Sequence, residues 1–293
     1  KKTTPFPIGS NPYRNYSMTP EQRYLFDING YLHIPNLLSD NELAAARAAI
    51  DRYTSTTDDA LPEGFSRSED SKNYENGFAF DKALEALTLH PGLWPIIKEF
   101  THDRPALTRG TLLVDSHEHE PLRLHCARED FGWQSTRYDT REGRIFCDDF
   151  VIFPYFDDVF PGDGGLLVVP GSHKAAFARP PELFNSGTTT ELKDLPAGVV
   201  NVTPRAGDAV VMTEMLAHGT LQWKPKDRLR RTLVLRYRPQ FKGQSAVPDV
   251  LAGRLSPETK ELMAQAHYTH IKEIVKQEVV QLTELHCNNR CEK

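Results

Sequence analysis

The chain has 293 residues, a formal net charge of −5 at pH 7 and a sequence pI near 6.1. This length is enough to bury a sizeable core within one domain. The acidic balance gives no bulk attraction to nucleic acid or anionic membranes, and no apolar run approaches the roughly 18 residues that span a bilayer. We therefore expect a globular protein that binds neither nucleic acid nor membrane and leave its oligomeric state open.

The four cysteines are Cys126, Cys147, Cys287 and Cys291. They are too few for a disulfide scaffold and are typical of a reducing compartment, so we expect a cytoplasmic location. The chain does not begin with Met, which leaves open an upstream targeting segment. His286 with the last two cysteines supplies only three ligands where structural zinc needs four, which favours a frayed tail.

The first hundred residues or so predict a helical layer over ~19–101. Thr19 is a cap residue followed by Pro at the first helical position, and Ser39 with Glu42 has the spacing of a capping box. Between these two helices, "YLHIPNLL" predicts a short strand. The segments "DKALEALTLH" and "PGLWPIIKEF" complete the layer.

From ~105 to ~240, short β-branched runs such as "DDFVIFPYF", "GGLLVVPG" and "DAVVMTE" alternate with Gly, Pro and Asp turns. Many short strands at this spacing predict a sandwich or barrel. Residues ~256–285 predict a long amphipathic C-terminal helix. Because nothing resembles a repeat or a linker, we predict one domain over 1–293.

Two segments of the β region carry candidate metal ligands. In "PLRLHCARED", His125 ends an alternating apolar and polar run. In "AGDAVVMTEMLAHGTLQW", a strand ends at Thr213, and Glu214 and His218 follow it. Histidine and carboxylate suit divalent iron. A single histidine without context is more often structural.

The strand that follows begins Arg230-Arg231-Thr232. An Arg-x-Thr pair suits a bound dicarboxylate, because guanidinium grips a carboxylate bidentately and the hydroxyl adds a hydrogen bond. Arg230 and Thr232 share one face of an alternating strand, which favours Arg230 over the competing Arg231.

Three segments, in order, resemble the phytanoyl-CoA dioxygenase (PhyH) family of Fe(II)- and 2-oxoglutarate-dependent oxygenases: "FDINGYLHIPNLLSDNEL", "GDGGLLVVPGSHK" and "AGDAVVMTEMLAHGT…RRTLVLRYRP". The resemblance covers residues ~20 to ~240. It implies a mainly β fold with flanking helices around a double-stranded β-helix (jelly-roll, cupin-like) core. It also implies Fe(II), 2-oxoglutarate and O2 as cofactor and co-substrates.

The same resemblance implies a role for each candidate residue. His125 becomes the first iron histidine and His218 the second, while Arg230 binds the distal carboxylate of 2-oxoglutarate with Thr232 beside it. The chain departs from the family at Ala127, where the usual pattern has Asp. Related iron halogenases also carry a small residue there, and a halide takes the vacant position.

A subgroup of the family that lacks this acid carries Thr-Glu before the distal histidine, which directs attention to Glu214. We therefore predict that Glu214 replaces the missing carboxylate. Other acids are weaker candidates: Glu129 and Asp130 are expected to turn away from the metal, Asp148 and Asp149 to face solvent, and "DSHEHE" (115–120) to form a surface loop.

The leading hypothesis is an Fe(II)/2-oxoglutarate-dependent dioxygenase of secondary metabolism that hydroxylates, desaturates or oxidatively cyclises a small molecule. Arginines near the first histidine favour an anionic substrate, such as a carboxylated amino acid of kainoid type. The arginines are Arg109, Arg123, Arg128, Arg137, Arg141 and Arg144. Two alternatives stay open: a halogenase, and a catalytically inactive jelly-roll binding protein.

Overall fold

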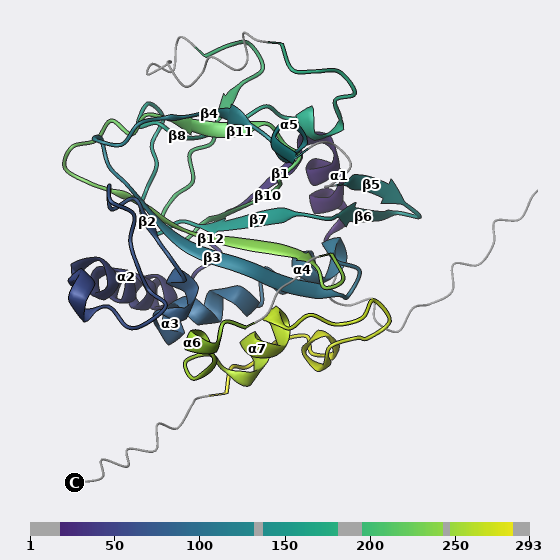
Figure 1. Cartoon of the computed structure of the whole chain (residues 1–293). Helices are drawn as coiled ribbons and strands as arrows, with labels where there is room; N and C mark the ends of the chain where they lie inside the picture. The colour runs from purple at the N-terminus through teal and green to yellow at the C-terminus, as the bar shows by residue number, and fades with distance from the viewer. Residues whose placement is uncertain (1–17, 132–136, 181–194, 243–246, 284–293) are drawn as a thin grey trace, which may run out of the picture.

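The computed structural model describes residues 18–131, 137–180, 195–242 and 247–283 (Figure 1). Two antiparallel sheets lie one above the other, with most helices on the outer face of the larger sheet. The larger sheet has the order β1-β10-β7-β12-β3-β2 and the smaller one β4-β11-β8-β9. This is the mainly β architecture with flanking helices that the sequence predicts.

The strands of the larger sheet are β1 (Tyr31–Ile34), β2 (Asn73–Tyr74), β3 (Pro105–Asp115), β7 (Phe150–Pro154), β10 (Ala209–Thr213) and β12 (Arg230–Pro239). Those of the smaller sheet are β4 (Leu122–His125), β8 (Gly165–Val168), β9 (Val200–Asn201) and β11 (His218–Leu221). A separate hairpin pairs β5 (Tyr138–Arg141) with β6 (Arg144–Cys147).

The α-helices are α1 (Pro20–Asn29), α2 (Asp40–Ser55), α3 (Lys82–Glu85), α4 (Trp94–Phe100), α5 (Ala127–Phe131), α6 (Asp249–Ala252) and α7 (Pro257–Met263). Short 3-10 turns are η1 (Asp58–Ala60), η2 (Gly77–Ala79), η3 (Ala86–Leu89), η4 (Ser172–Lys174) and η8 (Glu273–Lys276). Both predicted helix starts are confirmed, because Thr19 and Ser39 each close a capping box.

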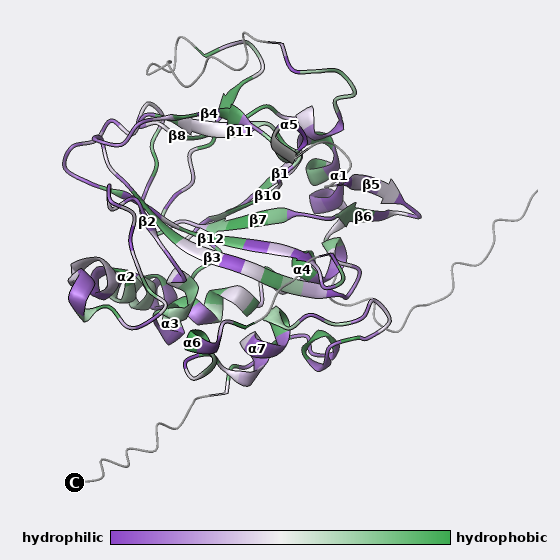
Figure 2. Cartoon of the chain, in the orientation of Figure 1, coloured by the Kyte–Doolittle hydropathy of each residue, from purple (hydrophilic) through white to green (hydrophobic). Residues whose placement is uncertain are grey.

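Strand β12 separates the apolar core from the space between the sheets. Leu233, Leu235 and Tyr237 are buried in the core that the strand shares with the helices. Because side chains alternate along a strand, Arg236 and Arg238 project from the opposite face, toward the smaller sheet. Figure 2 shows hydrophilic residues recurring along β12 and β3, whereas β7 is hydrophobic over most of its length.

The long helix predicted over ~256–285 is wrong, because α7 ends at Met263 and only η8 follows within the described residues. Side chains outside this segment bind its carbonyl groups: Arg104 donates to the carbonyl of Tyr268 at 2.7 Å, and Gln240 to that of His267 at 2.8 Å. Lys272, which is buried, donates back to the carbonyl of Leu262 at 2.8 Å. These contacts outweigh a weak helix propensity in the His- and Tyr-containing stretch.

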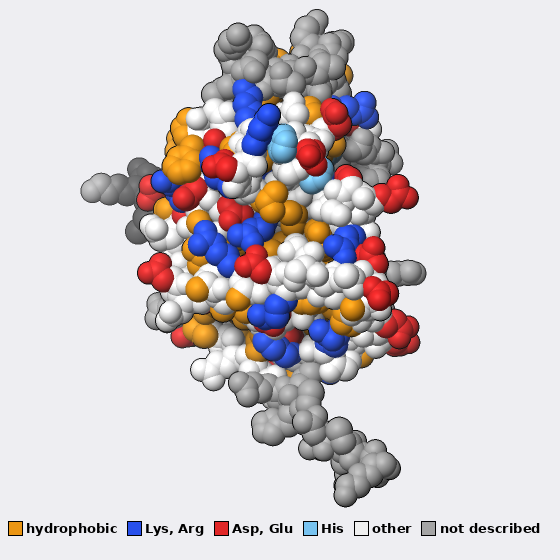
Figure 3. All heavy atoms as spheres, turned by 90° about the vertical axis from the view of Figure 1, so that its left-hand side faces the viewer, with side chains coloured by type: hydrophobic (Ala, Val, Ile, Leu, Met, Phe, Trp, Pro, Cys, Tyr) orange, Lys and Arg blue, Asp and Glu red, His pale blue; other side chains and the backbone are white. Residues whose placement is uncertain are grey.

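Acidic and basic side chains are intermixed over the face drawn in Figure 3, as expected of a chain with a small net charge. Within the described ranges, no helix has both the length and the apolar character needed to cross a membrane.

Candidate active site

Two histidines meet where strands of the smaller sheet pair. His125 ends β4, His218 begins β11, and the two residues are direct partners in the antiparallel register. Their ring centroids are 4.3 Å apart. Nδ1 of His125 lies 3.0 Å from the carbonyl oxygen of Arg123, and Nδ1 of His218 lies 2.8 Å from that of Leu216. Because a carbonyl only accepts, each Nδ1 carries the proton and each Nε2 keeps a lone pair for a metal.

The environment of His218 favours its neutral form. Burial lowers the pKa of His218 to about 3, and the neighbouring His125 and Arg236 act in the same direction. Metal ions bind neutral imidazole, so a low proton affinity removes competition for the lone pair. The donor set therefore suits iron.

Glu214 lies beside the position of the missing family acid. The backbone N–H of Ala127 donates to the carbonyl oxygen of Glu214 at 2.8 Å, which ties the segment after His125 to the segment before His218. The Glu214 side chain is buried, and its Oε1 accepts a hydrogen bond from Arg236 at 2.5 Å. Among the described residues, no group of three or more His, Cys, Asp and Glu side chains is arranged to hold a metal ion.

The expectation that Asp148 and Asp149 face solvent is wrong. Both are buried between the sheets and the hairpin, at 6% and 5% exposure. Asp148 pairs with Lys242 at 2.6 Å and Asp149 with Arg238 at 2.7 Å. Cations near the end of β12 therefore compensate two carboxylates that the sequence pattern placed at an exposed strand start.

Glu129 is paired with Arg179. Its carboxylate accepts two hydrogen bonds from Arg179, whose guanidinium also donates to the carbonyl of Leu124 at 2.7 Å. The side chain of Asp130 lies outside the described residues.

Arg230 is almost completely buried at 2% exposure and reaches across to the smaller sheet. Its Nη2 donates to Asp115 at 2.5 Å, while its Nε is buried without a hydrogen-bond partner in the part of the chain that the structure describes. A Cβ on Gly165 would come within 3.3 Å of the Arg230 side chain. Glycine at this position therefore avoids a close contact with Arg230. A buried donor without a partner suits a bound carboxylate.

Arg230 and Thr232 face the same side of β12, and Arg231 faces the other. The Thr232 hydroxyl is buried and donates to the carbonyl of Pro154 at 2.7 Å. Arg231 instead pairs with Asp157 at 2.8 Å and with Asp51 of α2 at 2.7 Å, on the helical side. The geometry thus separates the two candidate arginines as the strand alternation predicts.

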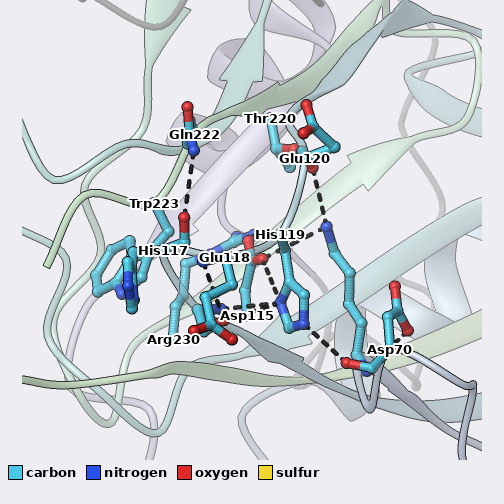
Figure 4. A network of polar contacts seen from close by, with 12 residues as sticks. Asp70, Asp115, His117, Glu118, His119, Glu120, Thr220, Gln222, Trp223 and Arg230 are labelled. Carbon is cyan, nitrogen blue, oxygen red and sulfur yellow. Dashed lines mark hydrogen bonds and ion pairs between the residues drawn. The ribbon is translucent and has the colours of Figure 1, made fainter. Parts of the chain in front are cut away.

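The "DSHEHE" segment provides the carboxylate that binds the Arg230 guanidinium (Figure 4). Asp115, its first residue, is the direct cross-strand partner of Arg230 and also lies 3.4 Å from Lys72 and 3.2 Å from His119. His119 in turn contacts the carbonyl of Asp70 at 3.0 Å. Burial alone would raise the pKa of Asp115, but Arg230, together with Lys72 and His119, more than offsets burial and lowers it. The expectation of a surface loop over 115–120 is wrong for Asp115, which ends β3 and is 3% exposed, because only the β3–β12 register pairs it with Arg230.

Comparison with family models matches the phytanoyl-CoA dioxygenase (PhyH) model over residues 26–232, more than half of the chain. The chain belongs to the phytanoyl-CoA dioxygenase family. It is an Fe(II)/2-oxoglutarate-dependent oxygenase with O2 as the second co-substrate. Comparison with curated proteins gave no significant match.

Several solved structures of such oxygenases share the fold. HygX from Streptomyces hygroscopicus, with nickel and 2-oxoglutarate bound, is 26% identical with a TM-score of 0.64, covering 77% of this chain and 88% of that one. EctD from S. alaskensis, with 2-oxoglutarate and 5-hydroxyectoine, is 17% identical with a TM-score of 0.59 and 79% of each chain covered. The carbocyclase SnoK from nogalamycin biosynthesis is 20% identical with a TM-score of 0.55, covering 76% and 85%. The jelly-roll core of PhyH-family oxygenases is thereby confirmed.

Replacing Asp115 by alanine leaves the Arg230 charge buried and uncompensated. We expect Asp115→Ala to lower the free energy of unfolding by about 3–5 kcal/mol in urea titrations. The control is Asp51→Ala, which removes an exposed partner of Arg231 and should cost no more than about 1 kcal/mol. Equal, small losses in the two variants would show that Asp115 does not compensate Arg230.

Proposed function

We propose that this oxygenase oxidises a small anionic metabolite, with iron bound by His125, His218 and Glu214 and with 2-oxoglutarate anchored by Arg230 and Thr232. The observation that carries the proposal is the histidine pair. Two adjacent imidazoles each have Nδ1 held by a carbonyl, so that both Nε2 lone pairs are available to one ion. Metal-bound histidines commonly have their other ring nitrogen held by a carbonyl in this way, which supports a ligand role for the pair.

Bound iron would supply the redox chemistry that couples O2 and 2-oxoglutarate, giving succinate and CO2, to oxidation of the substrate. The chain's share is binding and orientation. Arg230 presents a buried Nε to the distal carboxylate, and Asp115 fixes the guanidinium in place. Thr232 lies on the same strand face, and its hydroxyl, which donates to the carbonyl of Pro154 in this structure, would turn to donate to the carboxylate.

Glu214 is proposed as the third ligand because of where its backbone lies. The hydrogen bond between its carbonyl and Ala127 places it next to the residue where the family has Asp. Arg236 binds one carboxylate oxygen, Oε1, and a carboxylate has a second oxygen to offer a metal. The rival reading is a halogenase in which Glu214 stays with Arg236 and a halide lies beside Ala127.

For the substrate we propose a carboxylated amino acid of kainoid type or a similar anionic metabolite. The outcome is hydroxylation, desaturation or oxidative cyclisation, depending on which substrate atom faces the metal. The similarity to HygX, whose structure has also been solved with hygromycin B bound, supports a small molecule of secondary metabolism as the substrate.

The first test removes the histidines. We expect His125→Ala or His218→Ala to abolish succinate formation and to weaken nickel binding, measured by calorimetry, while the circular dichroism spectrum stays unchanged. His117→Ala is the control, since Gln222 contacts only the backbone carbonyl of His117. A histidine variant with wild-type turnover would remove that residue from the site.

The second test separates the two arginines. Arg230→Ala should raise the 2-oxoglutarate dissociation constant about 10- to 100-fold, since a charged bidentate contact contributes about 1.5–3 kcal/mol. Arg231→Ala, which removes contacts on the helical side, should leave that constant within about twofold. The reverse pattern would assign the co-substrate to Arg231.

The third test concerns Glu214. Glu214→Ala should lose iron affinity and activity, and added chloride should then restore part of the iron affinity by filling the gap. Glu129→Ala is the matched control, because that acid lies close to His125 in the chain but pairs with Arg179. A metal-bound structure with both Glu214 oxygens more than about 4 Å from the iron would contradict the proposal, since carboxylate ligands lie at roughly 2.0–2.2 Å.

A further inference from the structure

The inner face of the larger sheet gathers arginines close to the histidine pair. Arg236 and Arg238 project from β12 on the face opposite Leu235 and Tyr237. Arg109 of β3 is the direct cross-strand partner of Arg236, so the two share a face. The neighbouring Gly110 faces the other side, where a Cβ would meet Phe78 of the helical layer.

These guanidinium groups are more exposed than the acids that pair with them. The side chains of Arg236 and Arg238 are 35% and 41% exposed, whereas their partners Glu214 and Asp149 are only 8% and 7% exposed. Arg109 follows the same pattern at 57%, against 37% for Glu75. At these three ion pairs, the charge that reaches solvent is therefore mainly positive.

The cross-strand pair of Arg109 and Arg236 is unfavourable by itself. Like charges directly opposite each other on antiparallel strands destabilise a sheet. Because natural proteins break such local rules mainly at functional sites, this pair marks a candidate binding position. Arg236 also lies next to the metal ligands, because it holds Glu214, whose backbone contacts Ala127.

We propose that Arg109 and Arg236, with Arg238 beyond them, bind the anionic group of the substrate, a carboxylate or a phosphate. This inference rests on the proposed function, and it names the residues that would recognise the anionic group of the substrate. Cα atoms of directly opposed residues are roughly 4.5–5.5 Å apart, so one planar or tetrahedral anion can bridge both guanidinium groups. If Glu214 shares its charge with iron, Arg236 needs a new counter-ion, and the substrate anion supplies it.

Six arginines lie near the first histidine in sequence. Among those whose contacts the structure describes, only Arg109 lies opposite Arg236 on the inner face of the larger sheet. Arg128 donates to backbone carbonyls of the segment after β8, and Arg137 lies 5.9 Å from the Phe146 ring on the hairpin. Arg141 pairs with Asp139 at 2.7 Å on the same hairpin. The anion specificity is therefore carried by β3 and β12 rather than by the arginine-rich segment as a whole.

The experiment measures binding of anionic probes to the full chain loaded with nickel and saturating 2-oxoglutarate, by isothermal calorimetry. The probes are N-acetyl-L-glutamate, its uncharged diamide and inorganic phosphate. Saturating 2-oxoglutarate occupies the Arg230 site, so a probe reports a second anion site. The variant is Arg109→Met, and the control is Arg141→Met, an arginine of similar exposure (63% against 57%) that also pairs with one acid.

We expect the wild type to bind N-acetyl-L-glutamate or phosphate more tightly than the diamide, and the tighter anion identifies the substrate group. Arg109→Met should raise the dissociation constant of that anion about tenfold. This is a smaller loss than a buried contact would give, because Arg109 is exposed. Arg141→Met should leave binding unchanged, and 2-oxoglutarate affinity should be equal in all three proteins. Arg109→Lys should restore part of the binding, since charge returns without the planar donor fork.

Two results would overturn the inference alone: a diamide that binds as tightly as both anions, or equal losses in Arg109→Met and Arg141→Met. Failure of the wild type to bind nickel and 2-oxoglutarate would overturn the proposed function, and this inference with it. The two failures are distinguishable, because the co-substrate titration is carried out before any probe is added.

Discussion

The alternation of side chains along β12 is the constraint on which the rest of the molecule depends. One face of this strand, with Leu233, Leu235 and Tyr237, is buried in the core that holds the helices against the sheet. The other face carries Arg230, Thr232 and the arginines beyond them. A shift of one residue in register would exchange the two faces, exposing the core and burying charge against helices. The hydrophobic contacts of one face therefore fix the position of every polar group on the other.

A second register places the metal candidates. His125 and His218 are far apart in sequence and become neighbours because β4 and β11 pair with these two residues directly opposite each other. A backbone hydrogen bond from Ala127 to Glu214 also joins the segment after β4 to the segment before β11. Ligands held at strand ends by sheet pairing are positioned more rigidly than ligands on a free loop, which suits a site that must orient both co-substrate and substrate.

Local sequence patterns predicted those features whose causes are local. Cap residues marked the starts of α1 and α2, and alternation assigned Arg230 and Arg231 to opposite faces. Features set by distant contacts were missed or wrong. Asp149 is buried because Arg238 compensates it, and Asp115 is paired with Arg230 through a register that no short window contains. The C-terminal segment leaves the helix because side chains outside it bind its carbonyl groups, which a propensity argument does not include.

The charges between the sheets connect the absent family acid with the choice of substrate. Arg230 pairs with Asp115, which leaves its buried Nε without a partner and open to a bound carboxylate, and Arg238 pairs with Asp149. Arg236 pairs with Glu214, the residue that we propose as the third metal ligand in place of the acid that the family usually carries at the position of Ala127. In the site that we propose, Glu214 would give one oxygen to iron and keep the other on Arg236, so that the Arg236 guanidinium would retain positive charge for a substrate anion. Under this proposal, an acid that follows β10 instead of β4 would link the third metal ligand directly to the group that binds the substrate anion.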